Sequence, residues 1–337
     1  MKNKRISSKD VARESGVSQA TVSYVLNNNP HVKIKPETRQ NVLETAKRLN
    51  YHVNYIARNM RLRKSASVGI VANMDMSSYA FMKALEGIKD SLTENNYSPT
   101  ICFGTYDDIR DAEFIKYYYS NLIDGLIFVF CELGKIDIEF LNDNEIPYVL
   151  LNANTTKDSS SQIKTDITKA CTEAVSHLKS KGLTTIGYLG QQAGIKGSMR
   201  FEAYNNSMIL NKIKLERQYI HKINADESFL ELQLEYEIDL QNLPNAYICD
   251  NVNIGFYTLR YLQKNNINVP NDVSIIVLGT HEFSKRIYPT LSAIEAPLYK
   301  IGNRGAKMFF EVLQHGINQG DDNIVLEWEF NKRESCL

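Results

Sequence analysis

The chain has 337 residues, of which 43% are hydrophobic and 23% charged, and its formal net charge is zero. This length exceeds one ordinary core and predicts two or three domains. The longest apolar runs have the length of a buried strand, which excludes a membrane span, and no apolar segment follows the basic start as a secretory signal would require. We therefore expect a cytoplasmic protein with no membrane partner.

The zero net charge conceals a division of charge along the chain. Residues 1–64 carry 14 Lys and Arg against 4 Asp and Glu, while residues 65–337 carry 25 against 35. The formal charges of the two parts are therefore +10 and −10. A small basic head on a larger acidic body is typical of a polyanion-binding module joined to a second function.

The cysteines and histidines indicate neither a disulfide framework nor a metal site. The five cysteines are far apart and form no C-x-x-C pair, so we expect structural thiols in a reducing compartment. The six histidines do not have the spacing of metal ligands. The sequence also lacks a recognisable catalytic or phosphate-binding motif, so we expect no metal, no cofactor and no enzymatic activity.

The basic head predicts three short helices. Ser7 or Ser8 is placed to cap the first helix, Gly16 to end it in a tight turn, and Ser18 to cap the second. Apolar residues at helical spacing pack the second helix against the first, which predicts a helix-turn-helix. A third helix is predicted over residues 36–50. Its apolar stripe consists of Val42, Leu43, Ala46 and Leu49.

The second predicted helix presents uncharged hydrogen-bonding groups on its outer face. In a helix-turn-helix this helix lies in the major groove of double-stranded DNA, where amide and hydroxyl groups read base edges. Gln19 can pair in a bidentate manner with adenine, and the methyl group of Ala20 can contact thymine. Further groups suited to phosphates and base edges are Ser18, Thr21, Ser23 and Asn27.

The run "DVARESGVSQATVSYVLN" and the residues around it, from about residue 6 to residue 69, resemble the DNA-binding head of the lactose/galactose-repressor (LacI/GalR) family of bacterial transcription regulators. The resemblance implies base reading by Gln19, Ala20 and Tyr24, although the family often has Arg or His at the position of Tyr24. It implies further DNA contacts or supporting roles for Ser7, Ser8, Lys9, Ser18, Thr21, Ser23, Asn27, His31, Thr38 and Tyr51.

The segment "VNYIARNMRLRKS", residues 53–65, resembles the hinge helix of the same family. It is too short and too basic to hold a helix alone in water. In the family, two copies fold together on the minor groove at the centre of a two-fold symmetric operator. Met60 stands where a leucine usually wedges between base pairs and bends the duplex. The resemblance places four residues beside it: Asn54, Ala57, Arg58 and Arg61.

The body alternates predicted strands and helices. Its continuous apolar strands predict parallel sheets covered on both faces, arranged as two similar lobes with a cleft where the carboxyl ends of the strands converge. The Ser- and Thr-rich segment after residue 152 is expected to be a loop, and the chain ends in a final strand and a short tail. The earlier strands are predicted at 67–74, 98–103, 124–130, 146–152, 184–190, 219–223, 246–250 and 273–279. The helices are predicted at 79–95, 109–121, 136–143, 167–181, 198–212, 227–239, 252–265 and 298–313.

The late segments "VPNDVSIIVLG" and "YPTLSAIEAP" resemble the body of the same family, which is like a periplasmic sugar-binding protein. The fold class is therefore a small all-α helix-turn-helix domain plus an α/β periplasmic-binding-protein-like body of two parallel-sheet lobes. We expect a DNA-binding domain over 1–52, a hinge over 53–65, and an effector-binding and dimerisation domain over 66–337. The chain has no heptad extension of the kind that makes tetramers, which favours a homodimer.

The expected cleft departs from the family pattern, which uses carboxylates, an arginine, an amide and often an aromatic ring to bind a sugar. Arg200 matches the family arginine, Asn152 stands where some members have Asp, and Asp250 begins a reversed Asp–Asn pair. His281 replaces a common aspartate, and Phe81 is the candidate stacking ring. Because histidine donates hydrogen bonds and can be cationic, we expect a carbohydrate-derived effector other than a plain neutral hexose, for example one that carries a negative charge.

The sequence therefore predicts a sequence-specific DNA-binding transcription regulator, a repressor, whose operator affinity changes with a bound small ligand. One alternative is the same regulator responding to a protein partner or to no small molecule. A plain solute-binding module fits less well, because the helix-turn-helix is complete and no signal peptide precedes it. An enzyme is the least favoured class, because no residues are placed for chemistry.

Overall fold

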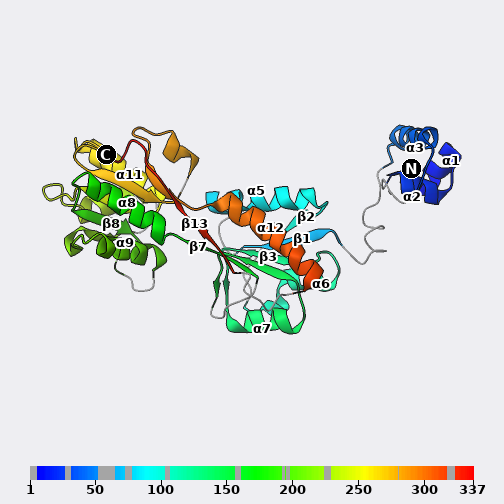
Figure 1. Cartoon of the computed structure of the whole chain (residues 1–337), viewed down its shortest axis with the longest axis horizontal. Coiled ribbons are helices and arrows are strands. Elements are labelled where there is room, and N and C mark those ends of the chain that lie inside the picture. The colour runs from blue at the N-terminus through cyan, green and yellow to red at the C-terminus, as the bar shows by residue number, and fades with distance from the viewer. Residues whose placement is uncertain are drawn as a thin grey trace. The chain divides into compact units, whose positions relative to one another are not determined.

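The computed structural model describes residues 6–26, 32–51, 65–72, 78–102, 107–155, 161–191, 194, 198–223, 229–279, 281–316 and 323–337. The chain divides into two compact units, Met1–Ser65 and Ala66–Leu337, each of which is described by itself (Figure 1). Within these described ranges no helix is long and apolar enough to cross a membrane.

The described residues of the first unit form three helices: α1 (Ser8–Ser15), α2 (Gln19–Leu26) and α3 (Pro36–Arg48). Ser7 and Asp10 form a capping box before α1, and Gly16 ends the helix in the left-handed conformation with a φ of 68°. Ser18 precedes α2, and its hydroxyl accepts a hydrogen bond from the backbone N–H of Thr21. The small core consists of Val11, Ala12, Val22, Val25, Val42 and Ala46.

The third helix differs from its predicted stripe at Leu43. This side chain is expected in the core, but it is 43% exposed, and Thr45 is buried instead. Val42, Thr45 and Ala46 have the i, i+3, i+4 spacing of one helix face, whereas Leu43 lies about 100° around the helix from Val42. Apolar character alone placed Leu43 on the wrong face.

The second unit contains two six-stranded sheets, which confirms the predicted two parallel-sheet lobes. The first sheet is entirely parallel, and the second is parallel apart from its last strand, which pairs antiparallel. The first sheet has the order β13 (Ile324–Glu327), β7 (Gln162–Asp166), β5 (Tyr148–Leu151), β3 (Leu126–Val129), β1 (Ser67–Val71), β2 (Ser98–Cys102). The second has the order β14 (Glu329–Asn331), β12 (Ser292–Glu295), β11 (Ser274–Leu278), β10 (Ala246–Cys249), β8 (Ile186–Gly190), β9 (Ile220–Lys222).

Helices cover both faces of each sheet and complete two lobes. The first lobe contains α5 (Tyr79–Glu94), η1 (Ile109–Asp111), α6 (Glu113–Tyr119), α7 (Lys135–Asp143) and α12 (Leu298–His315), with a small pair of strands, β4 (Glu132–Leu133) and β6 (Asn154–Thr155). The second contains α8 (Thr168–Ser180), α9 (Met199–Leu210), η2 (Arg217–Tyr219), α10 (Leu230–Glu237), α11 (Val252–Lys264) and η3 (Glu282–Lys285).

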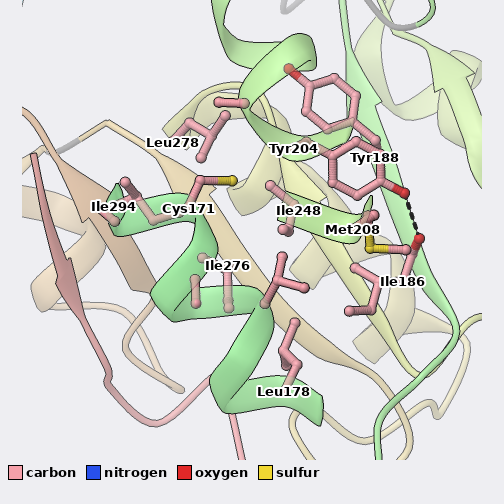
Figure 2. Close-up of a cluster of buried hydrophobic side chains, with 14 of the residues drawn as sticks. Cys171, Leu178, Ile186, Tyr188, Tyr204, Met208, Ile248, Ile276, Leu278 and Ile294 are labelled. Carbon is pink, nitrogen blue, oxygen red and sulfur yellow. Dashed lines mark hydrogen bonds between the residues drawn. The ribbon is translucent and has the colours of Figure 1, made fainter. Parts of the chain in front are cut away.

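Each sheet has an apolar core on either face, which explains its continuous hydrophobic strands. Figure 2 shows the core between the second sheet and the helices α8 and α9. In it the hydroxyl of Tyr204 donates to the backbone oxygen of Ile186 at 2.7 Å, so this polar group is satisfied although it is buried. All five cysteines are free and buried, as expected for structural thiols.

Besides the short pair β4 and β6, two strands of the large sheets lie where the sequence did not predict them. β7 occupies part of the segment expected to be a loop, because its sequence "QIKTD" has only one aliphatic residue and gives little strand signal. β12 lies in "SAIE", which is equally short. Both strands are added beside existing strands of their sheets, so pairing with neighbours rather than local propensity determines them.

The chain crosses between the lobes three times. The crossings run from β7 to α8, from β12 to α12, and from β13 to β14. Trp328 alone separates the last two strands, and its backbone N–H donates to the oxygen of Asp166 at the first crossing, with a distance of 3.0 Å. The first and third crossings are therefore hydrogen-bonded to each other.

In the first lobe, α5 and α12 pack with their backbones unusually close (Figure 1). A Cβ added to Gly302 would lie 1.9 Å from the backbone oxygen of Ala84, and one added to Gly87 would lie 2.2 Å from that of Tyr299. Glycine on both helices allows this approach, since any side chain would push the helices apart.

We predict that Gly302→Ala destabilises the body by about 2 kcal/mol or more, because the new methyl group meets backbone rather than a movable side chain. The measurement is urea denaturation followed by circular dichroism. Lys307→Ala is the control, since this exposed residue lies on the same helix, and it should change stability by less than about 0.5 kcal/mol. Equal stability of both variants would contradict the close helix contact.

Candidate functional site

The outer face of α2 presents the polar groups that the sequence predicts. Gln19, Ala20 and Tyr24 are exposed, and so are Ser18 and Ser23. The Nε2 of Gln19 donates to the hydroxyl of Ser8 at 2.7 Å, which links the start of α2 to the start of α1. This bond orients the glutamine amide while leaving its oxygen able to accept from a base edge.

The other described head residues fall into exposed and supporting positions. Lys9 is exposed, Thr38 is half-buried, and Tyr51 packs partly against the head core, with its N–H donating to the oxygen of Ala46. The hydroxyl of Ser7 is already used in the capping box, donating to Asp10 at 2.6 Å. Seven expected DNA-contact residues lie outside the described residues: Asn27, His31, Asn54, Ala57, Arg58, Met60 and Arg61.

A cavity of about 440 Å³ lies between the two lobes of the body. It is located at the carboxyl ends of the strands, as predicted for two parallel-sheet lobes. The first lobe contributes Ser78, Tyr79, Ala80, Phe130 and Asn152, and the second contributes Arg200, Asn251, Val252, Asn253, Leu278, Gly279 and His281. The second and third crossings and the start of α12 contribute Ala296, Leu298, Ile301 and Trp328.

The cavity wall offers positive charge and amide groups. Among the described lining residues, Arg200 is a cation, His281 offers its Nε2, and none is an aspartate or a glutamate. Three asparagines and a serine supply neutral polar groups, and aromatic and aliphatic side chains form the rest. Such a wall has hydrogen-bond donors in excess over anionic acceptors, which suits an acidic ligand.

Arg200 of this wall forms an ion pair with Asp250, which the sequence predicted to face the ligand but which is not among the lining residues. The Nη1 of Arg200 donates to the backbone oxygen of Asp250 at 2.6 Å and lies 3.3 Å from its Oδ1. The side chain of Arg200 is 41% exposed and reaches the cavity, whereas Asp250 is 6% exposed and lies behind it. The guanidinium also lies 6.0 Å from the ring of Trp328.

The asparagines of the wall also hold the fold. Asn152, with a φ of 47°, accepts bonds at its Oδ1 from the N–H and the hydroxyl of Thr165. Asn251 caps α11, because its Oδ1 accepts from the N–H of Ile254 at 2.9 Å. The side-chain oxygens are thus occupied, so both amides present NH₂ donors to a ligand.

An aromatic and polar contact, which we call the latch, joins the lobes beside the cavity. It consists of Tyr79 at the start of α5 and of His281 and Glu282 at η3. The hydroxyl of Tyr79 donates to the Oε1 of Glu282 at 3.1 Å, and the ring centroids of Tyr79 and His281 are 4.9 Å apart. Burial and this hydrogen bond raise the pKa of Tyr79, and the same bond lowers the pKa of Glu282.

The expectation for Phe81 is corrected. Its ring is fully buried in the core between the first sheet and the helices α5 and α12, and it is not one of the residues that line the cavity. A ring with no exposed surface cannot stack on a ligand in this conformation. Two residues earlier, Tyr79 is the aromatic ring of α5 that reaches the cavity, because positions two apart on a helix face different directions.

Sequence reasoning also missed Trp328, Asn253 and Phe130. Trp328 is the single tryptophan of the chain and lies between two short strands near its end. Its place between the lobes follows only from the sheet order, in which these two strands belong to different sheets. Asn253 lies two residues after the Asp–Asn pair, where the chain turns from β10 into α11. Residues that directly follow a parallel strand lie at the carboxyl edge of the sheet, so this position could have been predicted to face the cleft. Phe130 directly follows a predicted strand, which is the same signal.

Comparison with known proteins finds a family match in each of the two units. The family of bacterial regulatory proteins called lacI matches residues 8–54, and a periplasmic binding protein-like domain matches residues 175–336. Catabolite control protein A of Staphylococcus epidermidis is 30% identical over 300 residues, which cover 89% of this chain and 90% of that protein. The chain belongs to the LacI family. The HTH-type transcriptional regulator RegA of Clostridium acetobutylicum is also 30% identical, over 97% of this chain and 98% of that protein.

Solved structures of LacI-family proteins share the fold. The Lac repressor dimer bound to operator and the anti-inducer ONPF aligns with a TM-score of 0.77 and 19% identity, over 99% of this chain and 100% of that one. The transcriptional regulator CelR in complex with cellobiose aligns with a TM-score of 0.65 and 20% identity, over 98% and 100%. The chain is accordingly a LacI-family transcriptional regulator with a helix-turn-helix head and a two-lobed body.

We predict that the latch contributes to stability through one hydrogen bond. Tyr79→Phe and Glu282→Ala should each lower the midpoint of urea denaturation at pH 7, and the double variant should lower it no further than Glu282→Ala alone, because both single changes remove the same bond. Since the pKa of Glu282 is lowered in the folded state, this contribution is present above 4.5, its ordinary pKa, and is lost as the pH falls below it. Additive losses would show that the two groups are not coupled.

Proposed function

We propose that this LacI-family regulator is a homodimeric repressor that binds a two-fold symmetric operator and changes its operator affinity when an acidic, carbohydrate-derived ligand occupies the cavity between its lobes. The observation that carries the proposal is the cavity lining, where Arg200 and His281 face the space and none of the described lining residues is an aspartate or a glutamate. The head supplies the DNA contacts and the body supplies the response.

The proposed DNA interface separates affinity from specificity. Exposed cations such as Lys9, Lys33 and Lys35 attract phosphates irrespective of sequence. Gln19, Ala20 and Tyr24 are the proposed base readers, because their side chains are exposed on the helix that enters the major groove in this motif. Ser7, Ser8, Ser18, Thr21 and Ser23 are proposed to contact phosphates or support the readers, together with Asn27, His31, Thr38 and Tyr51.

The hinge segment is proposed to read the operator centre. Two copies of it would fold on the minor groove, with Met60 unstacking a base step and bending the duplex. Asn54, Ala57, Arg58 and Arg61 would flank the wedge. The Lac repressor structure, a dimer bound to operator, supports the two-fold arrangement by its shared fold.

The proposed ligand is small, polar and negatively charged. Arg200 and His281 favour a carboxylate or phosphate, and the NH₂ groups of Asn152 and Asn251 can donate to hydroxyls of the same molecule. CelR binds the neutral sugar cellobiose in its solved complex, which supports a carbohydrate skeleton. The ligand changes DNA affinity only to the extent that it prefers one arrangement of the lobes.

We predict that Gln19→Ala weakens binding to a duplex selected from a randomised library by about 10- to 100-fold, as expected for loss of a bidentate base contact worth about 1–3 kcal/mol. Binding to random duplex should be unchanged, because the phosphate contacts remain. Fluorescence anisotropy over a series of salt concentrations measures both affinities. The logarithm of either affinity should fall steeply with the logarithm of salt concentration.

Gln40→Ala is the matched control for this measurement. Gln40 is also an exposed helical glutamine, but it lies on α3 and hydrogen-bonds Glu44 within the same helix. It should leave both affinities unchanged. Equal losses on selected and random duplex in Gln19→Ala would contradict base reading, and failure to select any symmetric site would contradict the operator proposal.

We predict that glucose 6-phosphate or glucuronate raises the thermal midpoint of the protein more than glucose does. A ligand at one hundred times its dissociation constant adds about 2.7 kcal/mol of stability, which a thermal-shift measurement resolves. His281→Asp should reduce the response to the charged sugars and increase the response to glucose, because it replaces a donor by an anionic acceptor. Tight binding of glucose with no harm from His281→Asp would contradict the acidic ligand.

A further inference from the structure

The two residues of the Arg200–Asp250 ion pair differ in burial. Asp250 follows β10 and is buried, while Arg200 extends from α9 and presents part of its guanidinium to the cavity. A buried carboxylate that loses its cation is strongly destabilised unless another donor replaces it. Arg200 therefore cannot transfer its Nη1 to a ligand without a substitute at Asp250.

Tyr188 is the residue placed to be that substitute. It lies on β8, and its fully buried ring contacts the rings of Phe201 and Tyr204. Its hydroxyl approaches Asp250 closely enough to interact with it, but makes no hydrogen bond of normal length and direction among the described residues. An unpaired buried hydroxyl is costly, and most native structures avoid it. We therefore looked for a state of the protein in which the Tyr188 hydroxyl forms a hydrogen bond.

The carboxylate of Asp250 and the ring of Tyr188 both lie close to Gly190. A Cβ added to Gly190 would lie 2.9 Å from the Oδ2 of Asp250 and 2.9 Å from the Cε1 of Tyr188, the ring carbon next to the one that bears the hydroxyl. The absence of a side chain at Gly190 thus lets the two groups approach. Burial raises the pKa of Tyr188, and the nearby charge of Asp250 raises it further, so the hydroxyl keeps its proton.

Trp328 provides a second donor in the same place. Its indole Nε1 is buried and has no hydrogen-bond partner in the described part of the chain, while its ring lies against the guanidinium of Arg200. The hydroxyl of Tyr188 thus lies near the carboxylate of Asp250, and the indole of Trp328 lies against its partner Arg200. These donors outnumber the acceptors near them, and an anionic ligand would supply further acceptors.

We propose that Arg200 exchanges partners when an anionic ligand enters the cavity: its Nη1 moves from Asp250 to the ligand, and the hydroxyl of Tyr188 donates to Asp250 in its place. Tyr188 is then a positioning residue, which acts on the ligand through Asp250 and Arg200. The exchange rests on the proposed function in one respect, namely that the cavity takes a negatively charged ligand.

The exchange favours charged ligands over neutral ones for a physical reason. In the unliganded protein the Tyr188 hydroxyl is unpaired, and after the exchange it gains a bond to a carboxylate, which is stronger than a bond between neutral groups. A neutral ligand does not draw Arg200 away from Asp250, so it gains nothing from Tyr188. The tyrosine therefore contributes to charge selectivity and not to binding in general.

The test is Tyr188→Phe, which keeps the ring and removes the hydroxyl. Isothermal titration with glucose 6-phosphate, glucuronate and glucose should show the affinity for the two charged sugars reduced about tenfold, the factor that one hydrogen bond of about 1.4 kcal/mol supplies. The affinity for glucose should not change. The thermal midpoint of the unliganded variant should equal or exceed that of the natural protein, because the removed group is unpaired.

Tyr204→Phe is the matched control. Tyr204 packs beside Tyr188 in the same core, but its hydroxyl already donates to the oxygen of Ile186 at 2.7 Å. This variant should lower the unliganded thermal midpoint and leave the preference for charged sugars unchanged. The pair of variants therefore separates the proposed exchange from a general effect of removing a buried hydroxyl.

Three results would overturn the exchange. They are an unliganded Tyr188→Phe variant as destabilised as Tyr204→Phe, equal losses of affinity for charged and neutral sugars, and an unchanged affinity for the charged sugars. A natural protein that no charged sugar stabilises, yet that selects a symmetric DNA site, would overturn the exchange and the ligand proposal together while leaving the DNA-binding proposal intact.

Discussion

The body of this regulator depends on one property of its backbone, namely that all three crossings between the lobes leave from the carboxyl ends of strands. Because parallel strands end at the same edge of a sheet, the crossings and the loops that line the cavity converge in one place. The hydrogen bond from Trp328 to Asp166 joins two of these crossings directly. Rotation of one lobe against the other must therefore change the surroundings of a ligand, and a ligand can bias that rotation in return.

The same edge explains why structural and ligand-facing roles coincide in single residues. Asn152 and Asn251 each use their side-chain oxygen to hold a strand or cap a helix, which fixes the direction in which their NH₂ groups point. His281 similarly accepts the N–H of Phe283 while its ring contacts Tyr79. Preorganised groups of this kind lose little entropy on binding, so a few of them suffice for a small ligand.

Much of the fold could be predicted from the sequence, because long apolar strands and amphipathic helices carry strong local signals. The helix-turn-helix, the two lobes and the position of the cleft follow from such patterns. β7 and β12 were missed because they are short and are held by neighbouring strands rather than by their own composition. Arg200, Asn152 and His281 were placed in the cavity wall by motif, and the structure brings these three together.

The sequence could not predict which side chains of the site face the cavity and which face the core, because this depends on how each helix and strand is oriented in the packed structure. Phe81 and Tyr79 are two residues apart on α5, and only the helix orientation decides which ring is buried and which reaches the cavity. The close approach of Tyr188 and Asp250 depends on Gly190, which has no side chain. Trp328 became meaningful only when β13 and β14 were seen to belong to different sheets.

That position of Trp328 gives the protein a built-in optical reporter. The chain has a single tryptophan, it lies on the third crossing, and its indole ring rests against the guanidinium of the cavity wall. Indole emission responds to nearby charge and to the polarity of its surroundings. All tryptophan fluorescence of this regulator therefore comes from the point where the lobes meet, and its colour and intensity follow the state of the cavity without any added label.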